Sequence, residues 1–362
     1  MRKEGMDFAP KGKPAPVVKP GEFVFAAVGL NHGHIGGMCN GLIEAGGVLK
    51  YIYDTDEARL NQYLAMYPTA MAARSEDEVL GDKEVMLVAT SCIPSQRSDL
   101  ALRAMAAGKD FFTDKPPMTT LAQLEAARKM TAQTGRIYAI YYGERLHSEA
   151  GVFAGQLIEE GAIGKVVQTL GLGPHRISID KRPDWFFQRE HCGGILCDIG
   201  SHQIEQFLYY TGAKDAEIMA AQVENYNNPK YPGVDDFGDC TLKGDNGTTG
   251  YFRVDWLTPD ALSTWGDGRT FILGTEGYIE MRKNVDVTKS QQGENLFLVN
   301  HKVEQYYNLE GKVGYPYFGQ LVLDCLNRTE KAMSQEHAFK AAELCIRAQM
   351  MAEEAKGIVR RN

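Results

Sequence analysis

A carboxylate and an imidazole stand four residues apart in the segment Gly193–Gln203, which reads GGILCDIGSHQ. If this segment is helical, Asp198 and His202 lie on one face of the helix, and a helix that begins at Ser201 can also bring them close. A carboxylate beside an imidazole fixes its tautomer and tunes its basicity, and histidine exchanges a proton near neutral pH. The pair therefore predicts a general base oriented by an acid. The alternative interpretation is a histidine that satisfies a helix end.

A lysine occupies a second position suited to chemistry, in the segment Asp114-Lys115-Pro116-Pro117. This segment ends a predicted strand, and the carboxyl ends of parallel strands are where ligands bind. A lysine held there by a rigid Pro-Pro turn can point into a cleft, where its ammonium would polarise a hydroxyl or carbonyl oxygen. The alternative interpretation is a solvated lysine in a loop.

Five potential metal ligands fall within twelve positions of the chain: His191, Cys192, Cys197, Asp198 and His202. Their spacing is irregular and matches no zinc pattern known to us. We therefore predict no metal site. A metal-dependent isomerase or lyase that uses this cluster is an alternative function.

A glycine-containing loop, GLNHGHIG at residues 29–36, joins the first predicted strand to a helix. A dinucleotide pyrophosphate binds at such a loop because the backbone turns tightly and the helix N-terminus offers free N–H donors and a positive dipole end. Asp54 ends the second predicted strand, where a carboxylate accepts hydrogen bonds from an adenosine ribose and repels a 2′-phosphate. We therefore predict NAD rather than NADP. The predicted cofactor contacts are Gly29, Asn31, His32, Gly33, His34, Ile35, Asp54, Thr90, Pro94 and Lys115.

Strand-like and helix-like segments alternate through the first half of the chain. The predicted strands are 23–28, 48–53, 85–89, 111–113 and 137–142, and the predicted helices are 35–45, 56–66, 95–107 and 121–134. Repeated β-α alternation with short apolar strands predicts a Rossmann-type, doubly wound parallel sheet.

The second half has a different pattern, with helix-like stretches near 149–160, 201–211, 317–332 and 335–355. Strand-like runs lie at 166–172, 216–223, 239–242, 248–255, 270–273, 278–281 and 296–299. This pattern predicts a large, mostly antiparallel open sheet with helices on one face, so the fold class is α/β with two domains. The predicted divisions are an extended N-terminal arm at 1–21, an NAD-binding Rossmann domain at 22–145, and a substrate-binding and oligomerisation domain at 146–362.

The composition is that of a globular protein, with 44% hydrophobic and 24% charged residues. A net charge of -8 argues against broad binding of nucleic acid or anionic membranes. No apolar run approaches the roughly 20 residues that span a bilayer. The arm at 1–21 lacks a signal-peptide core and is expected to be mobile or to lie on a neighbouring subunit. Seven cysteines, an odd number, predict reduced thiols in the cytoplasm.

The chain resembles the Gfo/Idh/MocA family, which is named for glucose-fructose oxidoreductase and inositol dehydrogenase. The resemblance covers about residues 22–345 and rests on the glycine loop, on Asp114-Lys115-Pro116 for the family's E-K-P, on Gly193–His202 for G-G-x-x-x-D-x-G-x-H, and on G-T-E-G at 274–277. Three features depart from the family pattern. Aspartate replaces glutamate at position 114, the loop has Asn31 and His34 where a strict G-x-G-x-x-G has glycine, and Arg97 replaces a frequent histidine.

The resemblance implies a nicotinamide domain followed by an α/β domain, with Lys115, Asp198 and His202 lining the active site. It implies substrates such as sugars, glycosides and cyclitols. We expect NAD-dependent oxidation of a ring secondary hydroxyl, with C3 of a glycoside, giving a 3-keto glycoside, as one candidate position. His202 would take the hydroxyl proton, Lys115 would stabilise the charge on oxygen, and Asp198 would orient His202. Further predicted substrate contacts are Arg145, His175 and Trp185.

Two other functions stay open on the same fold. One is a redox-neutral, NAD-dependent enzyme that processes glycosides, and the other is a non-catalytic protein that senses a sugar or a dinucleotide. An open antiparallel sheet exposes an apolar patch unless it is covered. We therefore also expect a homo-oligomer, either a dimer, a tetramer or a larger assembly.

Overall fold

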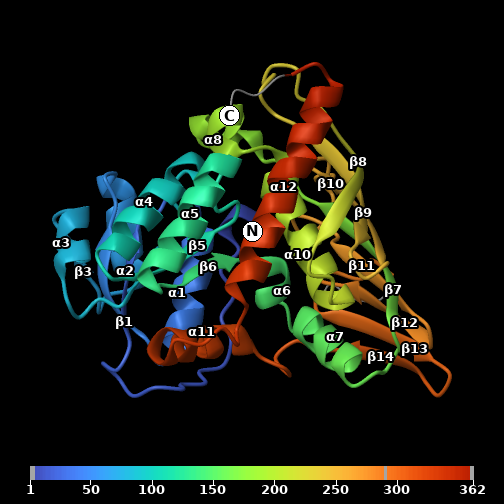
Figure 1. Cartoon of the computed structure of the whole chain (residues 1–362), viewed down its shortest axis with the longest axis horizontal. Coiled ribbons are helices and arrows are strands. Elements are labelled where there is room, and N and C mark those ends of the chain that lie inside the picture. The colour runs from blue at the N-terminus through green and yellow to red at the C-terminus, as the bar shows by residue number, and fades with distance from the viewer. Residues whose placement is uncertain (1–4, 289–291, 359–362) are drawn as a thin grey trace. The chain divides into compact units, whose positions relative to one another are not determined.

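The computed structural model describes residues 5–288 and 292–358 of the chain (Figure 1). The chain divides into two compact units. The Rossmann unit contains Met6–Tyr141 and Tyr315–Phe339, and the sheet unit contains mainly Tyr142–Gly314 and the chain from Lys340 onward. The sequence prediction instead assigns all of 146–362 to one domain.

Six parallel strands form the sheet of the Rossmann unit, in the order β3-β2-β1-β4-β5-β6. Their bounds are β1 (Val24–Val28), β2 (Val48–Tyr53), β3 (Met71–Ala72), β4 (Leu87–Thr90), β5 (Asp110–Asp114) and β6 (Tyr138–Tyr141). Every residue of β4, β5 and β6 is buried, as expected for short strands covered by helices on both faces. The strand order reverses between β1 and β4, which is where ligands bind in this architecture.

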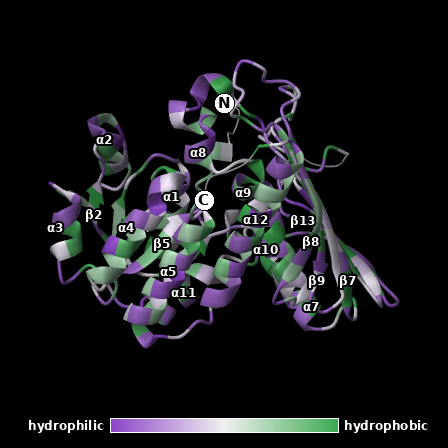
Figure 2. Cartoon of the chain, turned by 45° about the horizontal axis from the view of Figure 1, so that its top comes forward, coloured by the Kyte–Doolittle hydropathy of each residue, from purple (hydrophilic) through white to green (hydrophobic). Residues whose placement is uncertain are grey.

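Most helices of this unit begin at a capping side chain or at a proline, and they carry both hydrophilic and hydrophobic residues (Figure 2). The helices of the unit are α1 (His34–Glu44), α2 (Glu57–Met66), α3 (Glu76–Gly81), α4 (Pro94–Ala106), α5 (Leu121–Thr134) and α11 (Pro316–Asn327). Thr120 caps α5 by accepting a hydrogen bond from the Gln123 N–H, and Gly135 ends it with a φ of 63°. The predicted doubly wound parallel sheet is confirmed.

Helix α11 belongs to the Rossmann unit because its aromatic side chains pack into that unit's core. The Phe318 ring lies 6.3 Å from the rings of Phe112 and Tyr141. It also lies directly against Gly41 of α1, where a Cβ atom would clash with it. This packing groups 315–339 with residues that are far away in sequence.

The described part of the N-terminal arm packs on α1 of its own chain, while a contact with a neighbouring subunit stays a prediction. The N–H groups of Ala15 and Val17 donate to the carbonyls of Glu44 and Ala45, each at 2.9 Å. Asn40 Nδ2 donates to the Pro10 carbonyl at 3.3 Å. These contacts hold the described part of the arm along the helix.

Eight strands form the second sheet, in the order β14-β13-β12-β11-β7-β10-β9-β8. Their bounds are β7 (Val166–Pro174), β8 (Ala216–Glu224), β9 (Phe237–Gly244), β10 (Thr249–Asp255), β11 (Arg269–Gly274), β12 (Gly277–Arg282), β13 (Asn295–Asn300) and β14 (Glu304–Asn308). Among the described strands of this sheet, only β7 and β10 pair in parallel, so the predicted, mostly antiparallel sheet is confirmed.

One face of this sheet is covered by the helices α7 (Glu149–Glu159) and α10 (Gly200–Thr211) (Figure 1). The remaining helices are short, apart from α12 (Gln335–Ala355): α6 (Gly143–Leu146), α8 (Arg189–Cys192) and α9 (Ile195–Asp198). The G-T-E-G turn joins β11 to β12, and its Thr275 and Glu276 N–H groups donate to Lys165 and Ile163 carbonyls, both at 2.9 Å. This motif therefore has a structural role at the start of β7.

The opposite face of the sheet leaves large side chains exposed. The strand register places them on that same face, and their exposed fractions range from 37% to 46%. They are Leu170, Tyr251, Leu273, Tyr278 and Tyr306. None of the helices in the described ranges has both the length and the apolar character needed to cross a bilayer.

Replacing Gly41 by alanine should destabilise the Rossmann unit by about 1–3 kcal/mol, because the added methyl overpacks the buried Phe318 ring. The matched control is Gly81→Ala at the end of α3, where nothing lies within 4 Å of an added Cβ. Urea unfolding of both variants provides the test. Equal free energies of unfolding would contradict the packing described for α11.

Candidate active site

The glycine loop begins at a residue that only glycine suits. Gly29 has a φ of 71°, and a Cβ added there would lie 2.6 Å from Cys92 Cβ. Its N–H donates to the Tyr53 carbonyl at 2.9 Å, and its carbonyl accepts from the Ser91 N–H at 3.0 Å. The loop is thus tied to the ends of β2 and β4 and leads into the N-terminus of α1. A dinucleotide pyrophosphate fits this arrangement.

The other predicted cofactor residues contribute to this loop in different ways. Ile35 is fully buried in the core, so only its backbone is available, and Pro94 opens α4. Thr90 Oγ1 accepts from the Cys92 N–H at 3.1 Å and thereby shapes the end of β4. Asn31 and Gly33 are half-buried. These contacts position the loop, while their part in cofactor binding stays a prediction.

Asp54 lies at the end of β2, where the sequence predicts a ribose-binding acid. Its carboxylate accepts hydrogen bonds from the backbone N–H groups of Leu30 and Asp56, each at 2.7 Å. Arg59 of α2 pairs with the same carboxylate. The acid therefore links the glycine loop to the start of α2.

A buried carboxylate at the end of β5 connects the glycine loop to the lysine segment. Asp114 Oδ1 lies 2.9 Å from His34 Nδ1 and accepts from the Lys115 N–H at 2.8 Å. Its Oδ2 lies 3.4 Å from His32 Nδ1 and 3.5 Å from Arg97 Nη2. Burial alone would raise the pKa of Asp114, but His34, Arg97 and His32 outweigh it and hold that pKa well below its usual range.

Arg97 anchors the backbone on both sides of Lys115, a role that sequence reasoning missed. Its side chain is buried, and Nη1 donates to the carbonyls of Asp114 and Pro116, each at 2.8 Å. Its Nε donates to the Cys92 carbonyl at 2.7 Å. An arginine in the second turn of a helix that follows a strand end is the signal that could have indicated this role.

The same cluster is the group that comes nearest to a metal site in the described part of the chain. Single ligand atoms of His32, His34 and Asp114 lie within 4.8 Å of one another. The Arg97 guanidinium beside the carboxylate opposes a divalent cation electrostatically, so the arrangement suits a hydrogen-bonded network. Among these described residues, the potential ligands between 191 and 202 form no such group.

Asp198 and His202 lie on consecutive helices of the sheet unit rather than on one. Asp198 ends α9, and its N–H donates to the Gly194 carbonyl at 2.8 Å. His202 is buried in the first turn of α10, and Ser201 Oγ donates to the Asp198 carbonyl at 2.7 Å. The sequence allowed either one helix over both residues or a helix that begins at Ser201. The structure shows the second arrangement, with α10 beginning at Gly200. Lys115 belongs to the other unit.

Two further polar residues, Glu144 and Gln203, lie near the start of α10 within the sheet unit. Glu144 of α6 accepts a hydrogen bond from Gln203 Nε2 at 3.4 Å and lies 3.6 Å from His175 Nε2. His175 Nδ1 lies 3.2 Å from the Gly173 carbonyl, and its ring meets the Trp256 ring edge-on. A carboxylate, an amide and an imidazole therefore converge beside the start of α10. Gln203 follows His202 directly, which is the signal that could have indicated it.

The predicted substrate contacts at Arg145 and Trp185 have different surroundings. Arg145 is buried, makes a bidentate ion pair with Glu205 and stacks 3.7 Å above the centre of the Tyr209 ring. Burial lowers the pKa of Arg145, but the Glu205 charge and hydrogen bond outweigh it and raise that pKa. The guanidinium is thus engaged in a buried ion pair, and its contact with substrate stays a prediction. Trp185 is half-buried beside the Phe186 ring.

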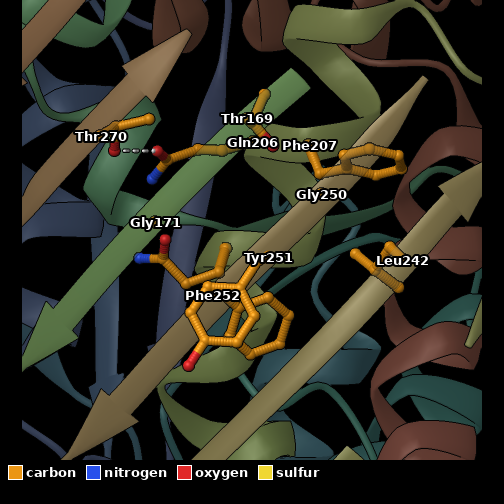
Figure 3. Close-up of a pocket in the computed structure, with 10 residues that line it drawn as sticks. Thr169, Gly171, Gln206, Phe207, Leu242, Gly250, Tyr251, Phe252 and Thr270 are labelled. Carbon is orange, nitrogen blue, oxygen red and sulfur yellow. Dashed lines mark hydrogen bonds between the residues drawn. The ribbon is translucent and has the colours of Figure 1, made fainter. Parts of the chain in front are cut away.

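A small pocket lies between α10 and the sheet (Figure 3). Its lining includes Gln203 but neither Asp198 nor His202. The side chains of Gln206 and Thr270 point toward each other there, and Thr270 Oγ1 donates to Gln206 Oε1 at 3.2 Å (Figure 3). Its lining combines such polar groups with Phe207, Leu242 and Phe252. We therefore regard it as an internal feature of the sheet unit.

Both units match models of one protein family. Residues 31–142 match an oxidoreductase family with an NAD-binding Rossmann fold, and residues 153–280 match the GFO/IDH/MocA C-terminal domain. The chain belongs to the Gfo/Idh/MocA family. This result confirms the resemblance and the predicted NAD cofactor of the Rossmann unit.

Relatives of established name match parts of the chain. A D-xylose dehydrogenase from Paenarthrobacter nicotinovorans is 24% identical over 152 residues, which are 41% of this chain and 39% of that protein. A scyllo-inositol 2-dehydrogenase (NAD(+)) from Bacillus subtilis (strain 168) is 28% identical over 212 residues, which are 57% of this chain and 58% of that protein. The chain thus spans less than two thirds of the length of these relatives.

Solved structures of other proteins align over nearly the whole chain. A structure from Erwinia carotovora atroseptica SCRI1043, named only as an oxidoreductase, is 50% identical with a TM-score of 0.89 and covers 91% of this chain and 99% of that chain. Levoglucosan dehydrogenase in complex with NADH and levoglucosan has a TM-score of 0.74 at 17% identity, covering 92% of this chain and 98% of that chain. At 17% identity, the likeness to levoglucosan dehydrogenase is a likeness of fold alone.

Replacing Glu205 by glutamine should destabilise the sheet unit by about 3–5 kcal/mol, because the charge of Arg145 then stays buried without its counter-charge. Glu224→Gln removes a more exposed partner of Lys356 and should cost less than about 1 kcal/mol. Urea unfolding of the two variants gives the comparison. A Glu205→Gln protein as stable as the control would refute a structural role for Arg145.

Replacing Asp114 by asparagine should reduce stability more at pH 5 than at pH 3. The folded-state pKa of Asp114 is lowered, so its contribution is complete above the unfolded value near 3.9 and is lost as the pH falls through the folded value. Urea unfolding at both pH values measures the gap to the wild type, with the exposed Asp99→Asn as control. A gap that is equal or larger at pH 3 would contradict the ionised cluster.

Proposed function

We propose that the protein is an NAD-dependent dehydrogenase that oxidises a ring secondary hydroxyl of a sugar, glycoside or cyclitol. The observation that carries the proposal is His202, buried in the first turn of α10 and preceded by Asp198 at the end of α9. Family membership and the names of relatives that act on xylose and scyllo-inositol support it. Carbon 3 of a glycoside is the position that we favour.

The residues that would hold NAD are the glycine loop from Gly29, the N-terminus of α1 and Asp54. The loop has the positive φ and the close backbone approach that a pyrophosphate requires, and α1 supplies N–H donors. When bound, NAD supplies the hydride acceptor for the substrate carbon. The remaining tasks, which are proton removal and stabilisation of charge on oxygen, fall to side chains of the chain itself.

His202 is proposed to take the hydroxyl proton as the general base. Asp198 is proposed to orient the imidazole, since the Ser201 hydrogen bond to the Asp198 carbonyl holds the two helix ends together. Lys115 is proposed to stabilise negative charge that develops on the substrate oxygen. Its backbone is held by Asp114 and Arg97, which limits the positions open to the ammonium.

The convergence of Glu144, His175 and Gln203 suits a substrate with several hydroxyl groups. A carboxylate accepts hydrogen bonds from vicinal hydroxyls, and an amide both donates and accepts. The half-buried Trp185 ring adds aromatic surface for the C–H face of a sugar, while the Trp256 ring beside His175 is buried. These contacts are part of the proposal for a polyol substrate.

We further propose that the protein is a cytoplasmic homo-oligomer. None of the seven cysteines, all of which lie in the described ranges, takes part in a disulfide, as expected in a reducing compartment. The exposed apolar side chains of the second sheet, such as Tyr251, Leu273 and Tyr278, would be covered in an assembly of two or more copies. Light scattering at micromolar concentration tests this, and a monomer would contradict it.

Replacing His202 by alanine should lower kcat by roughly 10²- to 10⁴-fold, the usual contribution of a positioned base, while the Kd of NAD stays unchanged. The reaction is followed by formation of reduced nicotinamide with a panel of hexoses, glycosides and inositols. The control is His301→Ala, a strongly exposed histidine of the same unit.

Loss of NAD binding in His202→Ala, or full activity, would overturn the assignment of the base. If the wild type binds NAD but no polyol reduces it, product analysis with glycosides distinguishes a redox-neutral enzyme from a sensing protein. Either of those results would contradict the proposed dehydrogenase.

A further inference from the structure

All acceptor positions of the Asp54 carboxylate are occupied by donors of its own unit. Oδ2 accepts from the Leu30 N–H at 2.7 Å and from Arg59 Nε at 3.3 Å. Oδ1 accepts from the Asp56 N–H at 2.7 Å and from Arg59 Nη2 at 3.0 Å. A carboxylate offers about four lone-pair sites. The hydroxyls of an adenosine ribose can therefore bond to Asp54 only if one of these donors withdraws.

Arg59 is the donor that can withdraw. The Leu30 and Asp56 donors are backbone groups, fixed by the glycine loop and by the start of α2. The Arg59 side chain is 34% exposed, and its Nη1 also lies 3.1 Å from Asp56 Oδ2. Asp56 is the N-cap of α2 and is itself 42% exposed. An Arg59 guanidinium that leaves Asp54 can stay paired with Asp56, which lowers the cost of the movement.

The same guanidinium changes the electrostatics of the ribose position. A bare carboxylate at the end of the second strand disfavours a 2′-phosphate, whereas an arginine nearby accommodates one. Here the carboxylate is 2% exposed and already neutralised by its ion pair with Arg59. Arginine binds phosphate through two parallel hydrogen bonds, so Arg59 can serve a 2′-phosphate in the geometry that it now offers to Asp54.

We propose that Arg59 sets how strongly the protein discriminates between NAD and NADP. It competes with the ribose hydroxyls for Asp54 and offers its guanidinium to a 2′-phosphate, so the preference for NAD is weaker than Asp54 alone would impose. This inference rests on the proposed placement of the adenosine ribose at Asp54.

The test is the ratio of the Kd of NADP to the Kd of NAD, measured by isothermal titration calorimetry on the full chain without substrate. In Arg59→Ala the ratio should rise about tenfold or more, because a hydrogen bond to a charged group is lost only for NADP. The fragments ADP and 2′,5′-ADP should show the same rise, which assigns the effect to the adenosine end. Arg74→Ala, which removes an 86%-exposed arginine of the same unit, should leave the ratio unchanged.

A second variant tests the reverse direction. Asp54→Asn removes the counter-charge of Arg59 and should lower the ratio of the Kd of NADP to the Kd of NAD below that of the wild type.

A ratio in Arg59→Ala that is unchanged or lower, with NAD still bound, overturns the inference and leaves the proposed dehydrogenase intact. A wild-type protein that binds neither NAD nor ADP overturns both the inference and the placement of the ribose.

Discussion

The buried Asp114 carboxylate is the interaction on which the Rossmann part of the site depends. One ionised group holds the two histidines of the glycine loop and the backbone of Lys115, while Arg97 binds the carbonyls on either side of that lysine. Such a group is costly to bury and stays ionised because three basic side chains surround it. The loop that would hold the pyrophosphate and the proposed catalytic lysine are therefore parts of one network and cannot shift independently.

Much of the fold could be predicted because local signals and tertiary packing agree. Helix α5 begins after a capping threonine and ends at a left-handed glycine, and the predicted range 121–134 is the observed one. The strand β14, with the sequence EQYYN, is polar and largely exposed, so no apolar pattern indicates it. The placement of α11 depends on Phe318 meeting Gly41, a contact between residues far apart in sequence that periodicity cannot reveal.

The residues that could do chemistry were recognisable, but their partners were less so. Glu144 and Arg145 are neighbours in sequence, yet one side chain reaches His175 and Gln203 while the other forms a buried pair with Glu205. The family motif indicated Asp198 and His202, whereas the break between α9 and α10 follows from the local backbone. The effect of Arg59 on Asp54 depends on four simultaneous hydrogen bonds, which only coordinates can show. Sequence reasoning thus indicated candidate residues, whereas their hydrogen-bond and ion-pair partners required the structure.

The proposed dehydrogenase requires that a substrate carbon give a hydride to NAD, which the Rossmann unit would hold. The most direct test incubates the purified protein and NAD with sugars and cyclitols that carry deuterium at every ring carbon, and then determines the mass of the reduced nicotinamide. We expect reduced NAD that carries one deuterium from a single substrate class. Reduced NAD without deuterium, or bound NAD that stays oxidised with every polyol, would contradict it.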